Sequence, residues 1–234
     1  DRDDWVQLRT PSSPFATANK LFLARLLPAE VDARIAEVVD DHRRRGASLR
    51  WVVDPQSEPA DLPQRLVAAG FDDPVETWGM HRSAHGDLPT VPIGTHIRAA
   101  TPDDDELIAD LGMRAWNPSP AFGESLRDVL RRTRDRQDVH YAIASIDGQP
   151  AGWSTLRLLP PLGYFQGACV LPEFRGRGVY RALVVHRLRQ LGRLGLDAGV
   201  IWASAHSSGP IAQSLGFEEI TRAQFLEFHP AKGG

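Results

Sequence analysis

The stretch QGACVLPEFRGRGVYRALVV, residues 166–185, decides the expected fold. It opens as an apolar run that ends at Pro172, and after two glycines it continues with apolar residues at helical spacing. This pattern is typical of a strand, a tight loop and a helix. Glycine lets the backbone turn sharply and lets a ligand approach, and the N–H groups at the start of a helix attract anions. Because Arg175, Arg177 and Arg181 add positive charge, we expect a phosphate-bearing ligand at this loop.

The spacing around the glycines argues against two common nucleotide-binding motifs. A P-loop requires a lysine directly after its last glycine, and the chain has no lysine between Lys20 and Lys232. A dinucleotide fingerprint that starts at Gly176 would need its third glycine at position 181, where the chain has Arg181. A side chain at that point would prevent close packing of the helix against the strand.

The stretch resembles instead the acetyl-CoA signature of the GNAT superfamily of N-acetyltransferases, V-x-P-x-x-R-G-x-G-[IV]. The matching residues are Val170, Pro172, Arg175, Gly176, Gly178 and Val179. Tyr180 departs from the pattern, because the family usually has Gly or Ala at that position. A second family signature, a strand followed by a small-residue helix that ends in Leu-Gly-Phe, resembles residues 198–217.

The resemblance implies that the chain binds acetyl-CoA as a co-substrate, and we expect no metal. The cofactor-binding residues that it implies lie on the strand before the loop, in the loop itself and at the later small-residue helix. They are Ala168, Cys169, Val170, Arg175, Gly176, Arg177, Gly178, Val179, Tyr180, Arg181 and Ser208.

Composition sets the outer limits. The 234 residues can form one large or two small domains, and 42% hydrophobic with 24% charged residues is ordinary for a globular protein. A net charge of −3 gives no reason to expect nucleic acid as a partner. The single Cys169 excludes an intramolecular disulfide and a cysteine-based zinc site. No apolar run approaches the roughly 20 residues of a membrane span, so we expect a cytoplasmic protein without a membrane partner, with a homodimer left open.

We expect a mixed α/β fold in two domains. Residues 83–95 are rich in Gly and Pro and mark the boundary, which divides the chain into residues 1–90 and 91–234. The second part shows the element order of a GNAT fold, with strands near 96–99, 139–146, 151–158, 164–171 and 198–203 and helices after Thr101, at 124–134 and after Gly178. Thr101 and the acids behind it are typical of helix capping rather than of a metal site.

The first part repeats a shorter version of this order. A run that ends at Pro28, a helix at 29–45, a strand with Trp51 and a Gly-Phe pair at 70–71 mirror the elements around Pro172 and Trp202. The separation from Pro to Trp is 23 residues in the first copy and 30 in the second, and the first copy lacks the glycine loop. Residues 1–90 are therefore predicted to be a smaller, truncated and degenerate GNAT-like domain without a cofactor site; chance similarity is the alternative.

In the superfamily a deprotonated amine attacks the thioester carbonyl directly and the CoA thiolate leaves. This chemistry needs a carbonyl polariser, a route for the amine proton and an acid near the sulfur. Backbone N–H groups near Val170 are the expected polariser. The usual family acid is a Tyr four residues before the glycine of Leu-Gly-Phe, and this position is Ala212 here. The candidates to replace it are His206, Tyr180, Ser207 and Ser208.

The sequence also leaves open which residue acts as the general base. By the period of two, Tyr164 and Gln166 fall on one face of the central strand, about where family members often carry a glutamate. A base from elsewhere (Glu124, Asp128 or His140) and a substrate that arrives deprotonated are the alternatives. The catalytic candidates are thus Tyr164, Gln166, His206 and Tyr180.

The acceptor is expected to be bordered by aromatic residues, although buried tryptophans more often serve the core. The substrate-binding candidates are Trp116, Phe122, Glu124 and Trp153, with Trp116 ranked first.

Three function classes remain. The leading one is an acetyl-CoA-dependent N-acetyltransferase that acts on an amine of a small molecule or peptide by direct attack in a ternary complex. The second is a non-catalytic acyl-CoA-binding regulator, which Ala212 and the degenerate first part favour. The third is RNA binding through Arg-Gly-Arg-Gly, which is disfavoured because interleaved aromatics and further basic tracts are missing.

Overall fold

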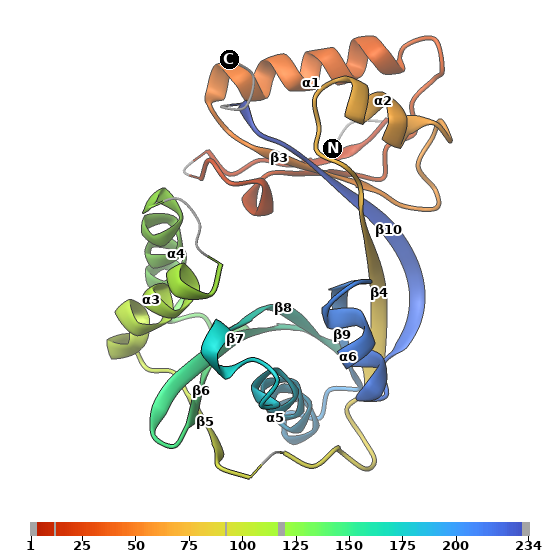
Figure 1. Cartoon of the computed structure of the whole chain (residues 1–234). Coiled ribbons are helices and arrows are strands. Elements are labelled where there is room, and N and C mark those ends of the chain that lie inside the picture. Colours follow the sequence, from red (N-terminus) through yellow and green to blue (C-terminus); the bar gives the residue numbers. More distant parts are fainter. Residues whose placement is uncertain (1–3, 12, 92, 117–119, 231–234) are drawn as a thin grey trace. The chain divides into compact units, whose positions relative to one another are not determined.

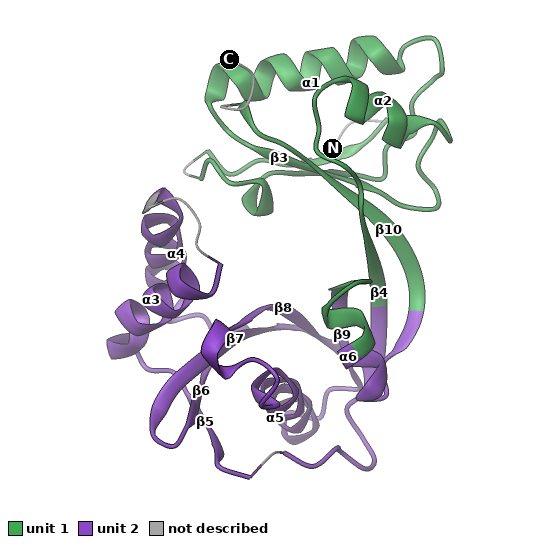
Figure 2. Cartoon of the chain, viewed as in Figure 1, with its two compact units in different colours: residues 1–79, 203–210, 220–234 green, residues 80–202, 211–219 purple. Residues whose placement is uncertain are grey.

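The structure, a computed structural model, describes residues 4–11, 13–91, 93–116 and 120–230. It has the expected mixed α/β architecture (Figure 1). The chain forms two compact units, coloured separately in Figure 2. Unit 1 comprises residues 1–79, 203–210 and 220–234, and unit 2 comprises residues 80–202 and 211–219.

Unit 1 packs helices against a small mixed sheet. Its elements are β1 (Val6–Leu8), a 3-10 helix (Ala16–Ala18), β2 (Lys20–Phe22), α1 (Val31–Arg45), β3 (Leu49–Val53), α2 (Leu62–Ala68), the first part of β4 (Val75–Ser83) and most of β10 (Glu218–Phe228). β1, β2, β3 and β10 are neighbours in that order, with β2 parallel to β3 and the other two pairs antiparallel. The core centres on Trp5 and Trp51, whose ring centroids lie 6.2 Å apart.

Helix α1 follows the sequence pattern closely. Val31, Ile35 and Val39 are buried on one face of it, as the helical spacing predicts. The helix ends at Gly46, whose φ of 59° is the left-handed conformation that glycine adopts without a steric penalty.

Unit 2 has a sheet with helices on both faces. Its elements are β5 (Thr95–Ala99), a 3-10 helix (Pro102–Asp104), α3 (Asp105–Trp116), α4 (Pro120–Thr133), β6 (Val139–Ile146), β7 (Gln149–Leu159), β8 (Leu162–Val170), a 3-10 helix (Pro172–Phe174), α5 (Val179–Arg193), most of β9 (Ala198–Ser204) and part of α6 (Ser208–Ser214). The strand order is β9, β8, β7, β6, β5, and only the β8–β9 pair among these is parallel. α3 and α4 cover one face and α5 covers the other (Figure 1).

The predicted hairpin between β6 and β7 is confirmed. Ile146 pairs with Gln149 across the two-residue turn Asp147-Gly148, and both turn residues have positive φ, 51° and 78°. Two left-handed residues in sequence match the twist of antiparallel strands, which explains why Asp-Gly occurs here.

The boundary between the two units differs from the predicted domain boundary at residue 90. Residues 80–90 cluster with unit 2, and the end of β10 clusters with unit 1 because residues 224–228 pair antiparallel with residues 49–53 of β3. Local sequence patterns carry no signal for a pairing between opposite ends of a chain.

Thr101 and the acids after it do cap α3, as the sequence indicates. Thr101 and Asp104 form a reciprocal capping box, in which the Thr101 amide donates to Asp104 Oδ2 at 2.7 Å. Arg98 donates two further hydrogen bonds of 2.6 Å to the same carboxylate. These bonds from Arg98 hold the pKa of the buried Asp104 carboxyl well below its usual range, against the opposing effect of burial.

We predict that Asp104→Asn lowers the free energy of unfolding at neutral pH by about 1–3 kcal/mol, because charge-assisted hydrogen bonds to Arg98 are lost. Since the folded pKa is depressed, the contribution of Asp104 is present above the unfolded pKa of about 4 and is lost as pH falls below it. Urea unfolding from neutral pH down to about pH 2 should show the two proteins converging. Asp103→Asn, at the exposed neighbour, is the control, and equal losses for both variants would contradict the assignment.

Candidate active site

The central feature of unit 2 is a strand pair that separates. β8 and β9 pair in parallel at Leu162 with Ala198, at Gly163 with Gly199 and at Tyr164 with Val200. Beyond this point β8 continues to Val170 along β7, and in the described chain its pairing with β9 does not continue. Residues 165–170 therefore present backbone donors and acceptors on the side of β8 that β9 has left.

A β-bulge lies where the strands separate. Thr155 pairs with Gly167 and Arg157 pairs with Tyr164, so β8 advances by three residues where β7 advances by two. The extra residue breaks the alternation of faces. Tyr164 therefore shares a face with Gly167, and the expectation that Tyr164 and Gln166 share a face by simple alternation is wrong.

Arg187 of α5 contacts both strands at the bulge. Its side chain is 1% exposed, and its guanidinium lies 4.3 Å from the centroid of the Phe165 ring. Arg187 Nη1 donates to the Thr155 carbonyl at 3.4 Å and Nε donates to the Leu183 carbonyl at 3.2 Å. Burial lowers the pKa of Arg187 to about 10, and the Tyr180 side chain opposes this shift, so the group stays cationic at neutral pH.

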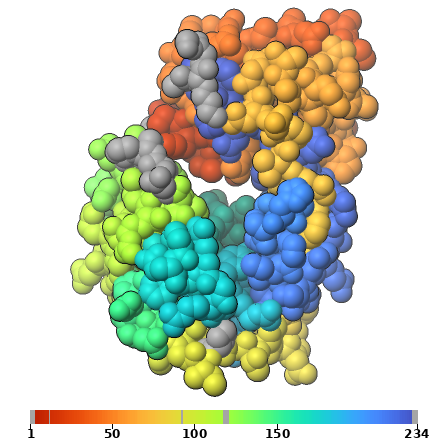
Figure 3. Space-filling model, viewed as in Figure 1, coloured from red at the N-terminus to blue at the C-terminus, as the bar shows by residue number. Residues whose placement is uncertain are grey.

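The glycine loop after β8 lies on the surface, within the cyan region of Figure 3. Gly176 and Gly178 have φ values of 75° and 79°, both in the left-handed region. Gly178 is the N-cap of α5 and supplies no side-chain cap. A Cβ added to Gly176 would meet no atom within 4 Å. The first N–H groups of α5 have no partner within the helix and lie at the positive end of a 15-residue helix, beside the exposed Gly176.

Arg175 supports this loop. Its Nη2 donates to the Ala115 carbonyl at 3.0 Å and its Nε donates to the Val170 carbonyl at 3.4 Å. These bonds connect the loop to the end of α3 and to the end of β8. The guanidinium of Arg175 is therefore engaged by the protein's own backbone.

The other two loop arginines lie nearer the surface. Arg177 forms an ion pair of 3.2 Å with Asp147, and Arg181 donates to the Ser214 hydroxyl at 3.1 Å. Asp147 is 75% exposed, so its pairing with Arg177 is weak and is readily exchanged for another anion.

The predicted acceptor aromatics come together on the α3 face of the sheet. Trp116 makes edge contacts with Phe122 and Trp153, at centroid distances of 5.6 and 5.8 Å, and Tyr141 lies 6.4 Å from Trp153. Trp153 is 4% exposed whereas Trp116 is 45% exposed. Glu124 is exposed on the same helix as Phe122. Trp116 is thus the surface member of an aromatic cluster whose base is buried.

The aromatic cluster adjoins the open strand. Trp153 of β7 pairs directly with Cys169 of β8, and residues in register across a sheet share a face. The sequence motifs, the separated strands and the aromatic cluster all fall within residues 108–217, and these residues match the Acetyltransferase (GNAT) family. A GNAT acetyltransferase domain thus occupies this part of the chain.

Two relatives are similar in sequence. An aminoglycoside N(6′)-acetyltransferase type 1 of Stenotrophomonas maltophilia is 29% identical over 144 residues, which cover 56% of this chain and 90% of that protein. A mycothiol acetyltransferase of Saccharomonospora viridis is 25% identical over 156 residues, which cover 59% of this chain and 51% of that protein. The chain therefore spans about half the length of the second relative.

Two solved structures share the fold over nearly the whole chain. A functionally unknown conserved protein from Staphylococcus epidermidis aligns with a TM-score of 0.73 at 13% identity, over 98% of this chain and 92% of its own. A tandem GNAT protein from the clavulanic acid biosynthesis pathway aligns with a TM-score of 0.60 at 16% identity, over 93% of this chain and 76% of its own.

Within this GNAT fold the buried thiol of Cys169 is unsuited to nucleophilic attack. Its Sγ donates to the Leu111 carbonyl at 3.7 Å, and burial raises the pKa of Cys169 to about 12. A neutral thiol is a poor nucleophile. The side chain of Cys169 is therefore unavailable to a ligand, and only its backbone and that of Ala168 and Val170 lie along the open side of β8.

The candidates for the acid fall in different places. Ala212, at the position of the usual family tyrosine, is 1% exposed. His206 and Ser207 are exposed in a turn, and Ser208 Oγ accepts a hydrogen bond of 3.0 Å from the Ser204 amide. These three candidates belong to unit 1.

The candidates for the base are also separated. His140 pairs with Leu156 on β6 and β7, so it lies on the sheet face opposite to its neighbour Tyr141 and to Trp153. Asp128 forms an ion pair of 2.7 Å with Arg132 on α4. The geometry of unit 2 thus does not place His140 beside the aromatic cluster.

Among the described residues, no helix combines the length and apolar character that crossing a membrane requires. In the same part of the chain, no three His, Cys, Asp or Glu side chains gather into a group suited to a metal ion.

We predict that Arg187→Ala lowers the free energy of unfolding by at least about 3 kcal/mol, because it leaves a cavity beside Phe165 and removes the charged donor to the Thr155 carbonyl. The matched control is Arg189→Ala, an exposed arginine on the same helix, which should change stability by less than about 0.5 kcal/mol. Urea unfolding measures both. Similar small losses would show that Arg187 does not support the bulge.

Proposed function

We propose that the chain transfers the acetyl group of acetyl-CoA to an amine of a small molecule or peptide, by direct attack of the amine on the thioester. The observation that carries this proposal is the open side of β8 immediately before the glycine loop. An acyl-CoA needs an extended partner for the amides of its arm and an anion site for its diphosphate. Residues 165–170 and the start of α5 offer these two features in sequence.

The loop fits a diphosphate. Gly178 leaves the start of α5 without a side-chain cap, and the first turn carries no acidic residue. Backbone N–H groups and the helix dipole favour an anion there. Arg177 and Arg181 lie close to the loop with partners that are exposed or neutral. The residues that would hold the diphosphate are thus the amides after Gly178, assisted by these two arginines.

The corresponding helix of unit 1 has the opposite character. Glu30 is the N-cap of α1 and Asp32 lies in its first turn, so negative charge stands where a phosphate would bind. This supports a degenerate GNAT-like role for the N-terminal part, without a second cofactor site. The alignment with a tandem GNAT protein over 93% of this chain agrees with that role.

Backbone amides supply the polarisation of the acetyl carbonyl in this proposal. N–H groups of the unpaired side of β8, within residues 166–170, are fixed donors that need no reorganisation when negative charge develops on the carbonyl oxygen. The buried neutral thiol of Cys169 offers no competing nucleophile. Direct transfer to the amine follows, without an acetylated enzyme.

Trp116 and its cluster define the acceptor side. The face of a tryptophan attracts cations, and a molecule with several amines keeps some of them cationic at neutral pH while the attacking amine is deprotonated. Trp116 is the exposed member of the cluster, and Trp153 places that cluster next to Cys169 of the open strand. One of the relatives is named for an aminoglycoside, so we favour a polar small molecule rich in amines over a peptide.

In this proposal the solvent takes the proton from the amine and supplies the proton to the CoA thiolate. Tyr180 is engaged with the Arg187 guanidinium, and Ala212 has no proton to give. The amine is therefore proposed to arrive deprotonated, and the CoA thiolate, a good leaving group, departs with little help from an acid. The second candidate function, a non-catalytic acyl-CoA-binding regulator, is favoured by the same buried Ala212.

We predict that Gly176→Ala weakens acetyl-CoA binding at least tenfold, because a side chain at φ 75° strains the loop that would position the amides for the diphosphate. The matched control is Gly195→Ala, since Gly195 also has a positive φ (69°) and no atom within 4 Å of an added Cβ. Calorimetry should give one acetyl-CoA per chain for the wild type. Two sites per chain, or equal affinity in both variants, would refute the cofactor assignment.

The function itself is tested by release of free CoA thiol from acetyl-CoA across a panel of aminoglycosides, diamines and peptide N-termini. We predict amine-dependent release, and a KM for the amine at least tenfold higher in Trp116→Ala, with the KM for acetyl-CoA within threefold. Val129→Ala, a comparably exposed residue on α4, is the control. Saturable acetyl-CoA binding without release on any amine would favour the regulator.

A further inference from the structure

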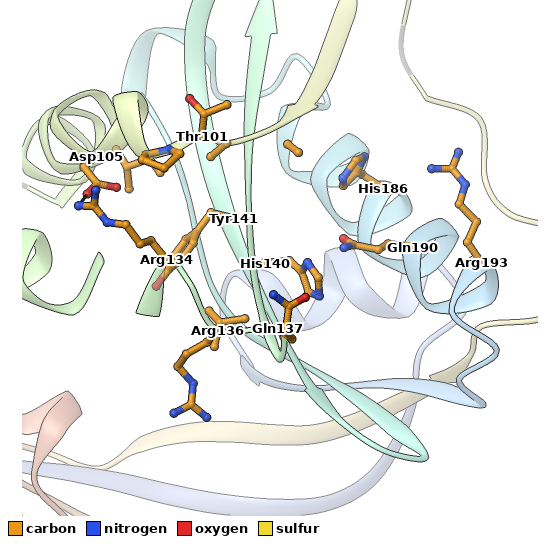
Figure 4. Close-up of a pocket in the computed structure, with 15 residues that line it drawn as sticks. Thr101, Asp105, Arg134, Arg136, Gln137, His140, Tyr141, His186, Gln190 and Arg193 are labelled. Carbon is orange, nitrogen blue, oxygen red and sulfur yellow. Dashed lines mark hydrogen bonds and ion pairs between the residues drawn. The ribbon is translucent and has the colours of Figure 1, made fainter. Parts of the chain in front are cut away.

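A polar cavity lies at the edge of the sheet in unit 2 (Figure 4). It has a volume of about 400 Å³ and is formed where β5 ends, where β6 begins, at the start of α3 and along the last half of α5. Figure 4 shows Arg134 and Asp105 on one side and His186, Gln190 and Arg193 of α5 on the other, with His140 between them. The volume is within the range of small-molecule sites.

The cavity is positively charged. Three arginines and one aspartate line it. Arg134 is paired with Asp105, and Arg136 is paired with Asp138 at 2.8 Å. Arg193 has no ion-pair partner among the residues that the structure describes. A cation without a partner beside a cavity raises the local concentration of anions.

Two histidines add hydrogen-bonding groups beside Arg193. His186 faces the cavity from α5, and burial together with the nearby Arg193 lowers its pKa. His140 Nε2 is buried and, in the described part of the chain, has no hydrogen-bond partner. Buried ring nitrogens are normally satisfied. The cavity therefore combines an unpaired guanidinium with an imidazole that lacks a partner.

The cavity is distinct from the glycine loop of α5. Its nearest lining residue on that helix, His186, is about 12 Å along the helix from Gly178. On α3 its nearest lining residue, Ile108, is about 12 Å from Trp116. Tyr141 borders the cavity and also lies 6.4 Å from Trp153 of the aromatic cluster.

We propose that this cavity binds a small organic or inorganic anion through carboxylate or phosphate oxygens, with Arg193 as the principal charged contact. The oxygens match the guanidinium donors, which form paired hydrogen bonds with either group. Gln190 and His186, one turn apart on α5, stand beside Arg193 as further donors. The cavity has room for an anion of a few carbon atoms.

The test is calorimetric titration of the full chain with inorganic phosphate and, separately, with succinate, each against sodium chloride of equal ionic strength. If the protein binds CoA, the titration is done with saturating CoA, so that phosphate does not bind at the glycine loop before α5. We expect one saturable site for at least one of the two anions. Phosphate alone or succinate alone identifies which oxygen group is preferred, and both support the proposal.

Arg193→Gln should weaken this binding at least fivefold. Arg131→Gln removes the same charge from an exposed position on α4 outside the cavity and should change affinity less than twofold. Side-chain NMR signals of His186 and His140 should shift on titration of the wild type and not of Arg193→Gln. Absence of saturable binding for both anions, or binding that Arg193→Gln leaves unchanged, overturns the proposal without bearing on acetyl transfer.

Discussion

The one-sided pairing of β8 is the constraint on which the candidate site depends. A strand inside a sheet normally satisfies its backbone groups on both sides, because each unpaired buried group costs free energy. β8 keeps β7 along most of its length and loses β9 after Tyr164. The exposed edge is thus a place where an extended ligand can add as a strand would, with the main chain supplying affinity.

A bulge in the β7–β8 pair lies where β9 separates from β8, and Arg187 stabilises it. An extra residue disrupts the ladder with β7, and Arg187 donates to the Thr155 carbonyl at that point. A buried guanidinium costs several kcal/mol in lost hydration, on the order of 2–4 after relaxation, unless hydrogen bonds replace water. A methionine would fill the same volume and satisfy no carbonyl. Because α5 carries Arg187 and begins directly after the glycine loop, this helix connects the proposed anion site to the open strand.

The sequence predicted the features that depend on neighbouring residues alone. The strand, loop and helix around Gly178, the Asp-Gly hairpin and the cap at Thr101 follow from side-chain period and backbone freedom, and the aromatic cluster at Trp116 follows from the family resemblance. The bulge was missed because alternation of faces assumes unbroken register, which only the β7 partner reveals. The assignment of the end of β10 to unit 1 was missed for a similar reason, since its partner β3 is at the other end of the chain.

The structure also separates charges that the sequence groups together. Arg175, Arg177 and Arg181 look equivalent beside the glycines, yet Arg175 uses its donors on two backbone carbonyls. By contrast, Arg193 at the other end of α5 has no ion-pair partner among the described residues. A cation in the last turn complements the negative end of the helix dipole, worth about 0.3–1 kcal/mol, and this accounts for Arg193 as a helix-terminal residue. It does not account for a cavity that collects Arg193, His186 and an unpartnered His140 nitrogen. Helix stability alone would be served equally well by an arginine far from any cavity. The exposed Arg193 borders a cavity that also holds a buried ring nitrogen without a partner, and the proposed anion accounts for both.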